Sequence, residues 1–288
     1  MNKTLRTFGL ATTGAAGLML ALCTPAAAQW PDYPTRNVPR TADGAVDVDA
    51  PAPRLADGHP DFSGLWEIAP GAIGGGAASR GGEAESPPQP QDSPPLATFF
   101  NIGANIEGGA PYQDWARELR DARVADGMKD NPDAHCLPMG HMQFHLHPQP
   151  RKIIHTPDEV VILYEGNAGI RQLFTDGRSR PDNDPTPWWY GYSHGWWEGD
   201  ELVVETTHFR DGGWLDVNGS PLTDQGRIIE RYRRPSFGRM EIDVTIDDPK
   251  AYTKPFTVRV NHRIMVDTNL IEFVCIENEM STRYFDQD

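Results

Sequence analysis

Four histidines lie within the sixteen residues of GHMQFHLHPQPRKIIH, residues 140–155, in a chain that has nine histidines. His145 and His147 flank a single leucine, so on a β-strand both imidazoles would face the same way. With His141 they could ligate zinc or iron and support a hydrolase or an oxygenase, provided that one coordination position stays open. The spacing therefore predicts one of three things: a metal site, metal-free proton carriers, or surface histidines.

The residues that follow weaken the metal prediction. Pro148 and Pro150 end any strand at once. The stretch PQPRK occupies the place where an H-x-H metal site needs a glutamate. We therefore favour His145 and His147 as ligand contacts or proton carriers at the mouth of a barrel, without an organic cofactor or a metal.

A second candidate lies in WWYGYSHGWW, residues 188–197. Because alternate side chains of a strand share a face, one face would be an aromatic wall that contains a histidine. Its members are Trp188, Tyr190, Tyr192, His194 and Trp196. Such a wall could stack a planar ligand, although aromatic stripes also occur as core packing. We predict His194 as acid or base, Tyr192 as an orienting group, and the other three residues as ligand contacts.

His262 shares an apolar face with its neighbours in FTVRVNHRIMV, residues 256–266. It should point into the barrel, either as a catalytic group or as a core histidine bonded to backbone carbonyls. Glu230, between apolar neighbours in RIIERYRR, is a weaker case of the same kind. A buried carboxylate beside a histidine shifts both pKa values, as acid-base catalysis requires, but the pair could equally be a structural ion pair. Arg171 in RQLFTDGR is a further predicted ligand contact.

The elements that must position these residues are mostly strands. In MEIDVTID, residues 240–247, apolar and polar residues alternate, which indicates a sheet with one dry and one wet face. Turn signals at 176–177, 198–200, 218–219, 237–238 and 267–269 separate roughly eight or more such strands. The predicted fold is mainly β, an antiparallel meander that forms a barrel or a sandwich, with one covering helix around residues 111–127.

Residues 1–28 have the layout of a secretory signal peptide, with Lys3 and Arg6 before an apolar run and TPAAAQ at its end. Cleavage after Ala28 would give a periplasmic or secreted protein; a lipid anchor at Cys23 is the alternative, although Leu22 is poorly suited to it. We expect an extended Pro/Ala-rich arm over 29–58. Residues 59–288 should then form one barrel-like domain with a flexible insertion over 70–98.

Export would leave Cys136 and Cys275 in an oxidising compartment, where we expect them to pair; two independent buried thiols are the alternative. The chain has a net charge of −15. A surface this negative repels phosphate backbones and anionic lipids. Nucleic acids and membranes are thus poor partners, and a small apolar or aromatic ligand is the better one.

Gly64-Leu65-Trp66, in DFSGLWEI, resembles the G-x-W of lipocalin-like barrels. The series DFSGLW, RQLFTDGR, WWEGDELVVETTHF, RIIERYRR and TIDDPKAYTKPF is similar to a broad family of exported bacterial β-rich proteins, over roughly residues 57–278. The resemblance implies a periplasmic barrel-like domain but no agreed reaction. Trp196, in place of a basic residue, and the histidine-rich 140–155 region depart from the family pattern and suggest a specialised ligand or reaction.

These observations predict a periplasmic, cofactor-independent enzyme that moves protons on a small aromatic or phenolic molecule, as a lyase or an isomerase does. Its catalytic residues would be His194, His262, Tyr192 and Glu230. A noncatalytic carrier of a small hydrophobic ligand is one alternative. A zinc or iron enzyme at His141, His145 and His147 is the other.

Overall fold

The computed structural model describes residues 33–70, 90, 92–179, 187–275 and 277. The predicted signal peptide and most of the predicted 70–98 insertion lie outside these ranges. Every element below belongs to the unit Pro34–Asp288. Within the described ranges, none of the helices combines the length and the apolar character needed to cross a membrane.

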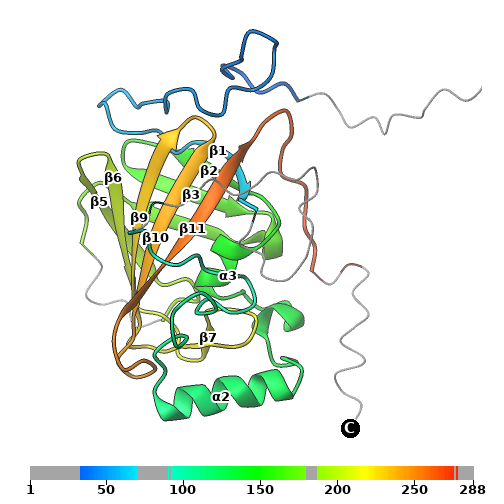
Figure 1. Ribbon diagram of the computed structural model, residues 1–288, viewed down its shortest axis with the longest axis vertical. Coiled ribbons are helices and arrows are strands. Elements are labelled where there is room, and N and C mark those ends of the chain that lie inside the picture. The colour runs from blue at the N-terminus through cyan, green and yellow to red at the C-terminus, as the bar shows by residue number, and fades with distance from the viewer. Residues whose placement is uncertain (1–32, 71–89, 91, 180–186, 276, 278–288) are drawn as a thin grey trace, which may run out of the picture. The chain divides into compact units, whose positions relative to one another are not determined.

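Nine strands close into a barrel in the order β1-β11-β10-β9-β6-β5-β4-β3-β2 (Figure 1). They are β1 (Gly64–Ile68), β2 (Arg151–His155), β3 (Glu159–Tyr164), β4 (Ile170–Phe174), β5 (Tyr192–Glu198), β6 (Glu201–Thr207), β9 (Arg227–Ser236), β10 (Arg239–Asp247) and β11 (Phe256–Met265). A small separate sheet pairs β7 (Gly213–Trp214) with β8 (Pro221–Leu222). The predicted mainly-β, barrel-like fold is confirmed.

One pair of strands departs from the predicted antiparallel order. β4 and β5 run parallel and are paired at two positions, Leu173 with Ser193 and Phe174 with His194. Parallel neighbours cannot be joined by a tight hairpin. The turn signal at 176–177 therefore begins a longer crossover between β4 and β5, and the barrel wall has a short seam there.

Apolar alternation orients the strands as expected. In β10, Met240, Ile242, Val244 and Ile246 are each at most 1% exposed, and they face the interior. The barrel end near β1 is closed by Trp66, which is fully buried and donates its indole N–H to the Phe62 carbonyl at 3.0 Å. The Arg234 guanidinium lies over the Trp66 ring, 4.8 Å from its centroid, so a cation–π contact completes this closure.

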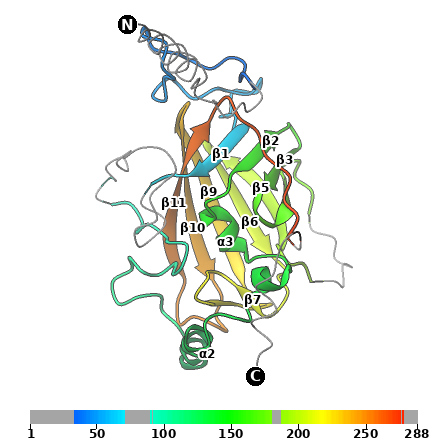
Figure 2. The ribbon, with the colours of Figure 1, turned by 90° about the vertical axis from the view of Figure 1, so that its right-hand side faces the viewer.

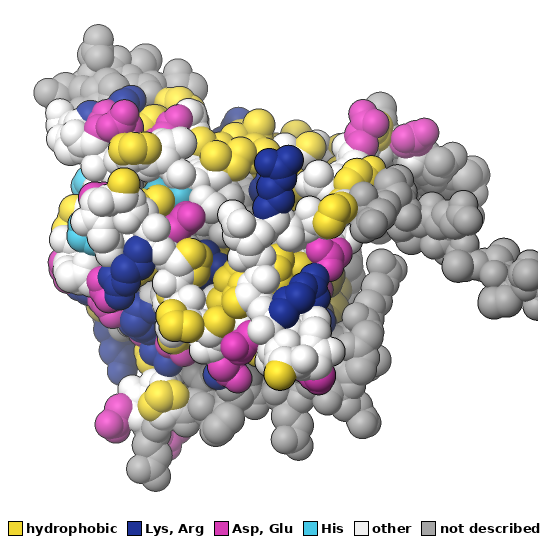
Figure 3. Space-filling view, turned by 90° about the horizontal axis from the view of Figure 1, so that it is seen from above, with side chains coloured by type: hydrophobic (Ala, Val, Ile, Leu, Met, Phe, Trp, Pro, Cys, Tyr) yellow, Lys and Arg dark blue, Asp and Glu magenta, His cyan; other side chains and the backbone are white. Residues whose placement is uncertain are grey.

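The segment 34–60 and the helix α2 (Asp114–Ala125) lie at opposite ends of the barrel (Figures 1 and 2). Ser236 donates to the Val48 carbonyl at 2.7 Å, which fixes the segment to the β9–β10 turn. Seen from this end, basic, acidic and hydrophobic side chains are interspersed on the surface (Figure 3). The predicted covering helix is present; it buries Ala116, and Trp115 is 41% exposed and donates to the Lys250 carbonyl.

The region predicted as an H-x-H strand is instead a short helix, α3 (His141–Leu146), and all six of its residues are buried. The 3-10 turns η1 (Pro132–His135) and η2 (Gly166–Ala168) lie before and after it in the chain. A Cβ at Gly140 would lie 1.4 Å from the Trp214 carbonyl oxygen, so only glycine allows α3 to begin at this depth. The predicted Cys136–Cys275 disulfide is confirmed, and it joins segments 139 residues apart next to this helix.

Candidate functional site

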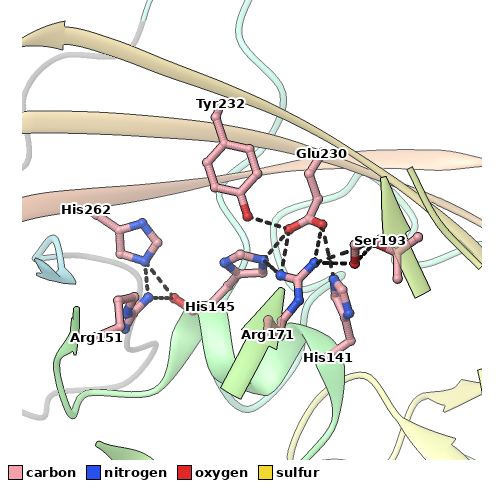
Figure 4. A network of polar contacts seen from close by, with 9 residues as sticks. His141, His145, Arg151, Arg171, Ser193, Glu230, Tyr232 and His262 are labelled. Atoms are coloured by element: carbon pink, nitrogen blue, oxygen red, sulfur yellow. Dashed lines mark hydrogen bonds and ion pairs between the residues drawn. The ribbon is translucent and has the colours of Figure 1, made fainter. Parts of the chain in front are cut away.

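A buried carboxylate lies at the centre of a polar cluster inside the barrel (Figure 4). Glu230, on β9, is fully buried and accepts two hydrogen bonds from the guanidinium of Arg171 on β4, at 3.1 and 2.7 Å. The Tyr232 hydroxyl donates to it at 2.9 Å, and His145 Nε2 lies 2.5 Å from its Oε1. Every one of these partners favours the charged form of Glu230.

The helix α3 brings two histidines to this carboxylate. His141 and His145 are four residues apart and therefore lie on one face of the helix. His141 Nε2 is 3.4 Å from Glu230 Oε2. Because His145 Nε2 faces a carboxylate, this nitrogen carries the ring proton, and Nδ1 retains a lone pair. Glu230 therefore holds His145 in one tautomer and one orientation, as the carboxylate of a catalytic triad does for its histidine.

Burial sets the charge state of the cluster. It lowers the pKa of His145, and it lowers the pKa of His141 to about 4, with the Arg171 charge acting in the same direction. Burial alone would raise the pKa of Glu230, but the Arg171 charge and the two histidines lower it well below its ordinary value. At neutral pH the site thus contains an ionised Glu230, a charged Arg171 and two neutral imidazoles.

His262 faces the interior, as predicted, but it does not meet Glu230. Its Nε2 contacts Arg151 Nη1 and lies 2.9 Å from the His145 carbonyl oxygen. Arg151 also donates to the carbonyls of His145 and His147, at 2.7 and 2.9 Å, and so caps the C-terminus of α3. The predicted pairing of His262 with Glu230 is wrong, because α3 enters the barrel between them and places His145 there instead.

Polar atoms without a hydrogen-bond partner gather in this region. Of the buried side-chain atoms in the described residues, those that lack a hydrogen-bond partner here include Nδ1 of His141, of His145 and of His262, and Nε of Arg151. Buried polar atoms are normally satisfied, and exceptions often mark functional sites. The pattern marks the lumen around His145 as the candidate site.

A pocket of about 120 Å³ opens on the outer side of the barrel at the β4–β5 seam. Aromatic residues line it, together with Arg171 and Ser193, whose side chains turn into the lumen. Ser193 donates to or accepts from Thr206 at 2.8 Å and lies 3.4 Å from Arg171 Nη2. The strand segments that carry Arg171 and Ser193 thus separate the outer pocket from the Glu230 cluster. The aromatic walls are Phe174, Trp188, Tyr190 and Tyr192.

Two residues of the predicted aromatic wall lie elsewhere. His194 is on the outer face of β5, where its side chain is 36% exposed and lies 3.8 Å from Glu205. Trp196 is 40% exposed on the same face. The prediction that His194 points into the lumen is wrong, because the small-residue face of β5, with Ser193, is the one that turns inward. Aromatic residues occupy both faces of this strand, so alternation alone could not select the inner one.

The remaining predicted ligand contacts divide between two places. Trp188, Tyr190 and Tyr192 line the pocket on the outer side of the barrel, not the lumen where the aromatic wall was predicted to hold a ligand. His147 lies beyond the end of α3, and its ring packs edge-on against Phe99 at 5.4 Å. The predicted trio of His141, His145 and His147 is therefore not assembled, because His147 leaves the helical face that carries the other two.

One group of described residues has metal-ligand spacing. His141, His145 and Glu230 each offer a ligand atom, and these atoms lie within 4.8 Å of one another. Two histidines and one carboxylate suit Fe(II) or Zn(II). The Arg171 guanidinium, however, already binds both oxygens of this carboxylate, and a dication beside it would leave a large uncompensated positive charge in a buried site. The charge balance thus weighs against a resident metal.

The sequence did not single out Arg151, Tyr164 or Thr206. Arg151 precedes Lys152-Ile153-Ile154, where two adjacent apolar residues obscure the alternation that would have shown which face is buried. Ser193 was visible as part of the small-residue face of β5. Only the structure shows that this face turns inward and that the aromatic face lies outside.

Comparison of the chain with protein-family models, with curated proteins and with solved structures finds no match, so what the site does is inferred from its own geometry.

Proposed function

We propose that the protein is a cofactor-independent enzyme that acts by proton transfer on a small phenolic molecule bound at the β4–β5 seam. The observation that carries this proposal is His145, whose Nε2 is held 2.5 Å from a buried carboxylate while its Nδ1, among the described atoms, has no partner. A neutral imidazole oriented in this way is a competent general base near neutral pH.

The reaction class follows from the base and the phenol. His145 accepts the proton of the ring hydroxyl, directly or through one water molecule. The electron pair left on oxygen moves through the ring to the side-chain carbon opposite, and the bond from that carbon to its leaving group breaks. The leaving group takes up the proton, so a quinone methide and the protonated fragment are the products. No electron acceptor is needed, and the step is that of a lyase.

The matched variants His145→Gln and His194→Gln test this proposal. Wild type and variants would be incubated with phenols that carry an organic leaving group on the side-chain carbon para to the ring hydroxyl, and release of the protonated leaving group would be followed by NMR. We expect His145→Gln to lower kcat by about 100-fold or more with little change in binding. We expect His194→Gln to be close to wild type, because His194 lies on the outer surface. Equal rates in the two variants would contradict the role of His145.

The pH profile is a second readout of the same base. Activity requires neutral His145, and burial lowers the pKa of this group below its ordinary value of 6.5. We therefore expect kcat/KM to be constant around neutral pH and to fall only at a pH below 6.5. Three charged groups contact His145: Arg151, Arg171 and Glu230. They keep their charges across this pH range.

A noncatalytic carrier is the second candidate. It is favoured by the closure of the cluster, since His141, His145 and Glu230 are each at most 1% exposed. In a carrier, His145→Gln would change affinity only in proportion to lost contacts, and no phenol would be converted. Conversion that depends on His145 excludes this candidate.

We also propose that the mature protein is periplasmic. The Cys136–Cys275 disulfide supports this location, because disulfides persist in oxidising compartments. Expression of the full chain in a Gram-negative host should yield a periplasmic product that begins at Gln29. A product that retains the first 28 residues in the cytoplasm would contradict both the cleavage site and the location.

A further inference from the structure

We infer that Arg151 and His262 are positioning residues, which together hold the backbone carbonyl of His145 and so fix where its imidazole stands against Glu230. The inference rests on the proposed function in taking His145 as the base. Neither side chain needs to touch the substrate, because both act through the helix α3, which carries His145.

The two side chains meet at one oxygen atom. Arg151 Nη1 donates to the carbonyl oxygen of His145 at 2.7 Å, and His262 Nε2 lies 2.9 Å from the same oxygen (Figure 4). His262 Nε2 also contacts Arg151 Nη1, so the three groups form a closed triangle. Both side chains belong to residues that are 2% exposed. Because the interior is closely packed, this carbonyl cannot move without displacing one of them.

His145 is held from two parts of the barrel wall. Arg151 on β2 and His262 on β11 flank the strand β1, which pairs with both of these strands. Glu230 belongs to β9, and its carboxylate contacts the imidazole of His145 at 2.5 Å. The backbone of His145 is therefore fixed from one side and its ring from another. A helix of six residues has too little stability to set this geometry by itself, so the two anchors must do so.

The buried charge of Arg151 has no ion-pair partner among the described residues. Its guanidinium donates instead to three carbonyls near the end of α3, at 2.7, 2.9 and 3.4 Å, those of His145, His147 and Gln149. Burial of a cation without a carboxylate is costly, and it lowers the pKa of Arg151 to about 10. An apolar side chain would avoid this cost but would leave these carbonyls without their donor. The cation lies where a helix C-terminus favours positive charge, so its contribution is to anchor α3.

NMR of the His145 side chain tests the inference in the full mature protein without any substrate. The Nε2–H proton shared with Glu230 should resonate far downfield, because this hydrogen bond is short and involves a charged group. His262→Leu removes both contacts of the imidazole, so we expect this resonance to move upfield. His262→Gln offers an amide donor and an amide acceptor and should restore it. A resonance that stays at the wild-type position in His262→Leu would overturn the inference.

A matched pair of arginine variants separates position from stability. Arg151→Lys loses the planar fork that reaches several carbonyls, so the His145 resonance should again move upfield. Arg263→Lys makes the same change on β11, where the side chain pairs with Glu67 at 2.7 Å, and should leave the resonance in place. Equal shifts in the two variants, or no shift in either, would overturn the role of Arg151.

The comparison is made on variants that circular dichroism shows to be folded. Where His262→Leu does not fold, His262→Asn replaces it, because its amide is one methylene shorter than that of His262→Gln and cannot reach the same carbonyl. A resonance at the same position in the Asn and Gln variants would overturn the role of His262.

Turnover distinguishes this inference from the proposed function. With His145 as the base, His262→Leu should lower kcat by about 100-fold, the effect of a small misplacement, with little change in KM. His262→Gln should recover most of this loss. A shifted resonance in a protein that shows no turnover dependent on His145 would support the positioning role while contradicting the proposed enzyme. Turnover that depends on His145 but is unchanged in His262→Leu would overturn the positioning role.

Discussion

At the scale of single residues, the site depends on one ion pair. Glu230 and Arg171 are both almost fully buried and are joined by two hydrogen bonds. Removing one charge from a buried pair leaves the other without a partner in a low-dielectric interior. The pair therefore orients His145 and at the same time makes the lumen sensitive to any change of charge.

The variant Glu230→Gln tests this dependence. We expect the free energy of unfolding to fall by about 3–5 kcal/mol, because Arg171 stays charged and buried. The control is Glu205→Gln, which removes a partly exposed carboxylate on the neighbouring strand β6 that pairs with Arg227. It should cost about 1 kcal/mol or less. Urea denaturation of the two variants measures both values, and similar losses would contradict a special role for the buried pair.

Arg171 already binds both oxygens of Glu230, so we expect no metal ion to bind at His141, His145 and Glu230. Zinc or Fe(II) added in excess to untagged protein should leave the thermal unfolding midpoint unchanged, because a ligand that binds the folded state must raise it. The matched variant His141→Gln should behave in the same way. A metal-dependent rise in the midpoint that His141→Gln abolishes would show that the group of His141, His145 and Glu230 binds the ion after all.

At the scale of elements, the position of α3 decides which residues meet. The helix is only six residues long, and its burial depends on the contact between Gly140 and the Trp214 carbonyl. A short helix has little stability of its own, so tertiary packing must hold it in the lumen. Loss of this packing would displace His141 and His145 together.

Gly140→Ala should therefore destabilise the fold and remove activity. Its new methyl group would overlap the Trp214 carbonyl, and overpacking of this kind costs about 1–3 kcal/mol or more. Gly213→Ala is the control, since a Cβ there would meet Leu222 at an ordinary 3.5 Å. Thermal unfolding of both variants checks the prediction, and equal stability would contradict the proposed packing of α3.

Some of these elements could be predicted from the sequence and others could not. Strands with clean alternation, such as β10, and the G-x-W strand could be predicted, because each has one apolar face. The helix at HMQFHL could not be predicted, because polar and apolar residues occur on every side of it. It is held in the helical conformation by its packing inside the barrel. β5 could not be oriented either, because both of its faces carry tryptophan.

At the scale of the whole molecule, the disulfide and the charge state determine stability. The pair Cys136–Cys275 and the inward direction of His262 and Glu230 followed from composition and alternation. The pairing of His145 with Glu230 did not, because it depends on a contact between segments 85 residues apart. Long-range packing of this kind leaves no periodic signal in the sequence.

The double variant Cys136→Ser/Cys275→Ser should unfold more easily by about 5 kcal/mol, the value expected in the chain-entropy account for the loss of a cross-link over so long a loop. Guanidinium denaturation of the oxidised protein and the variant measures the difference. A difference near zero would mean that the unfolded chain is not appreciably restricted by the bridge.

Stability should also fall in mild acid. The pKa values of His141 and His147 are lowered to about 4 in the folded protein, chiefly by burial, whereas an unfolded histidine takes up its proton near 6.5. Between these pH values the unfolded state binds more protons, so stability is fully present above 6.5 and is lost as the pH falls towards 4. The loss should be on the order of a few kcal/mol. Urea midpoints that stay constant over this range would contradict the buried, neutral state of these groups.

The most direct test of the central claim is the protonation state of the His145 imidazole, measured by nitrogen-15 NMR at neutral pH and assigned by comparison with His145→Gln. The account predicts a neutral ring that carries its proton on Nε2, facing Glu230, and a free lone pair on Nδ1. A doubly protonated ring, or a proton on Nδ1 instead, would contradict the assignment of His145 as the base.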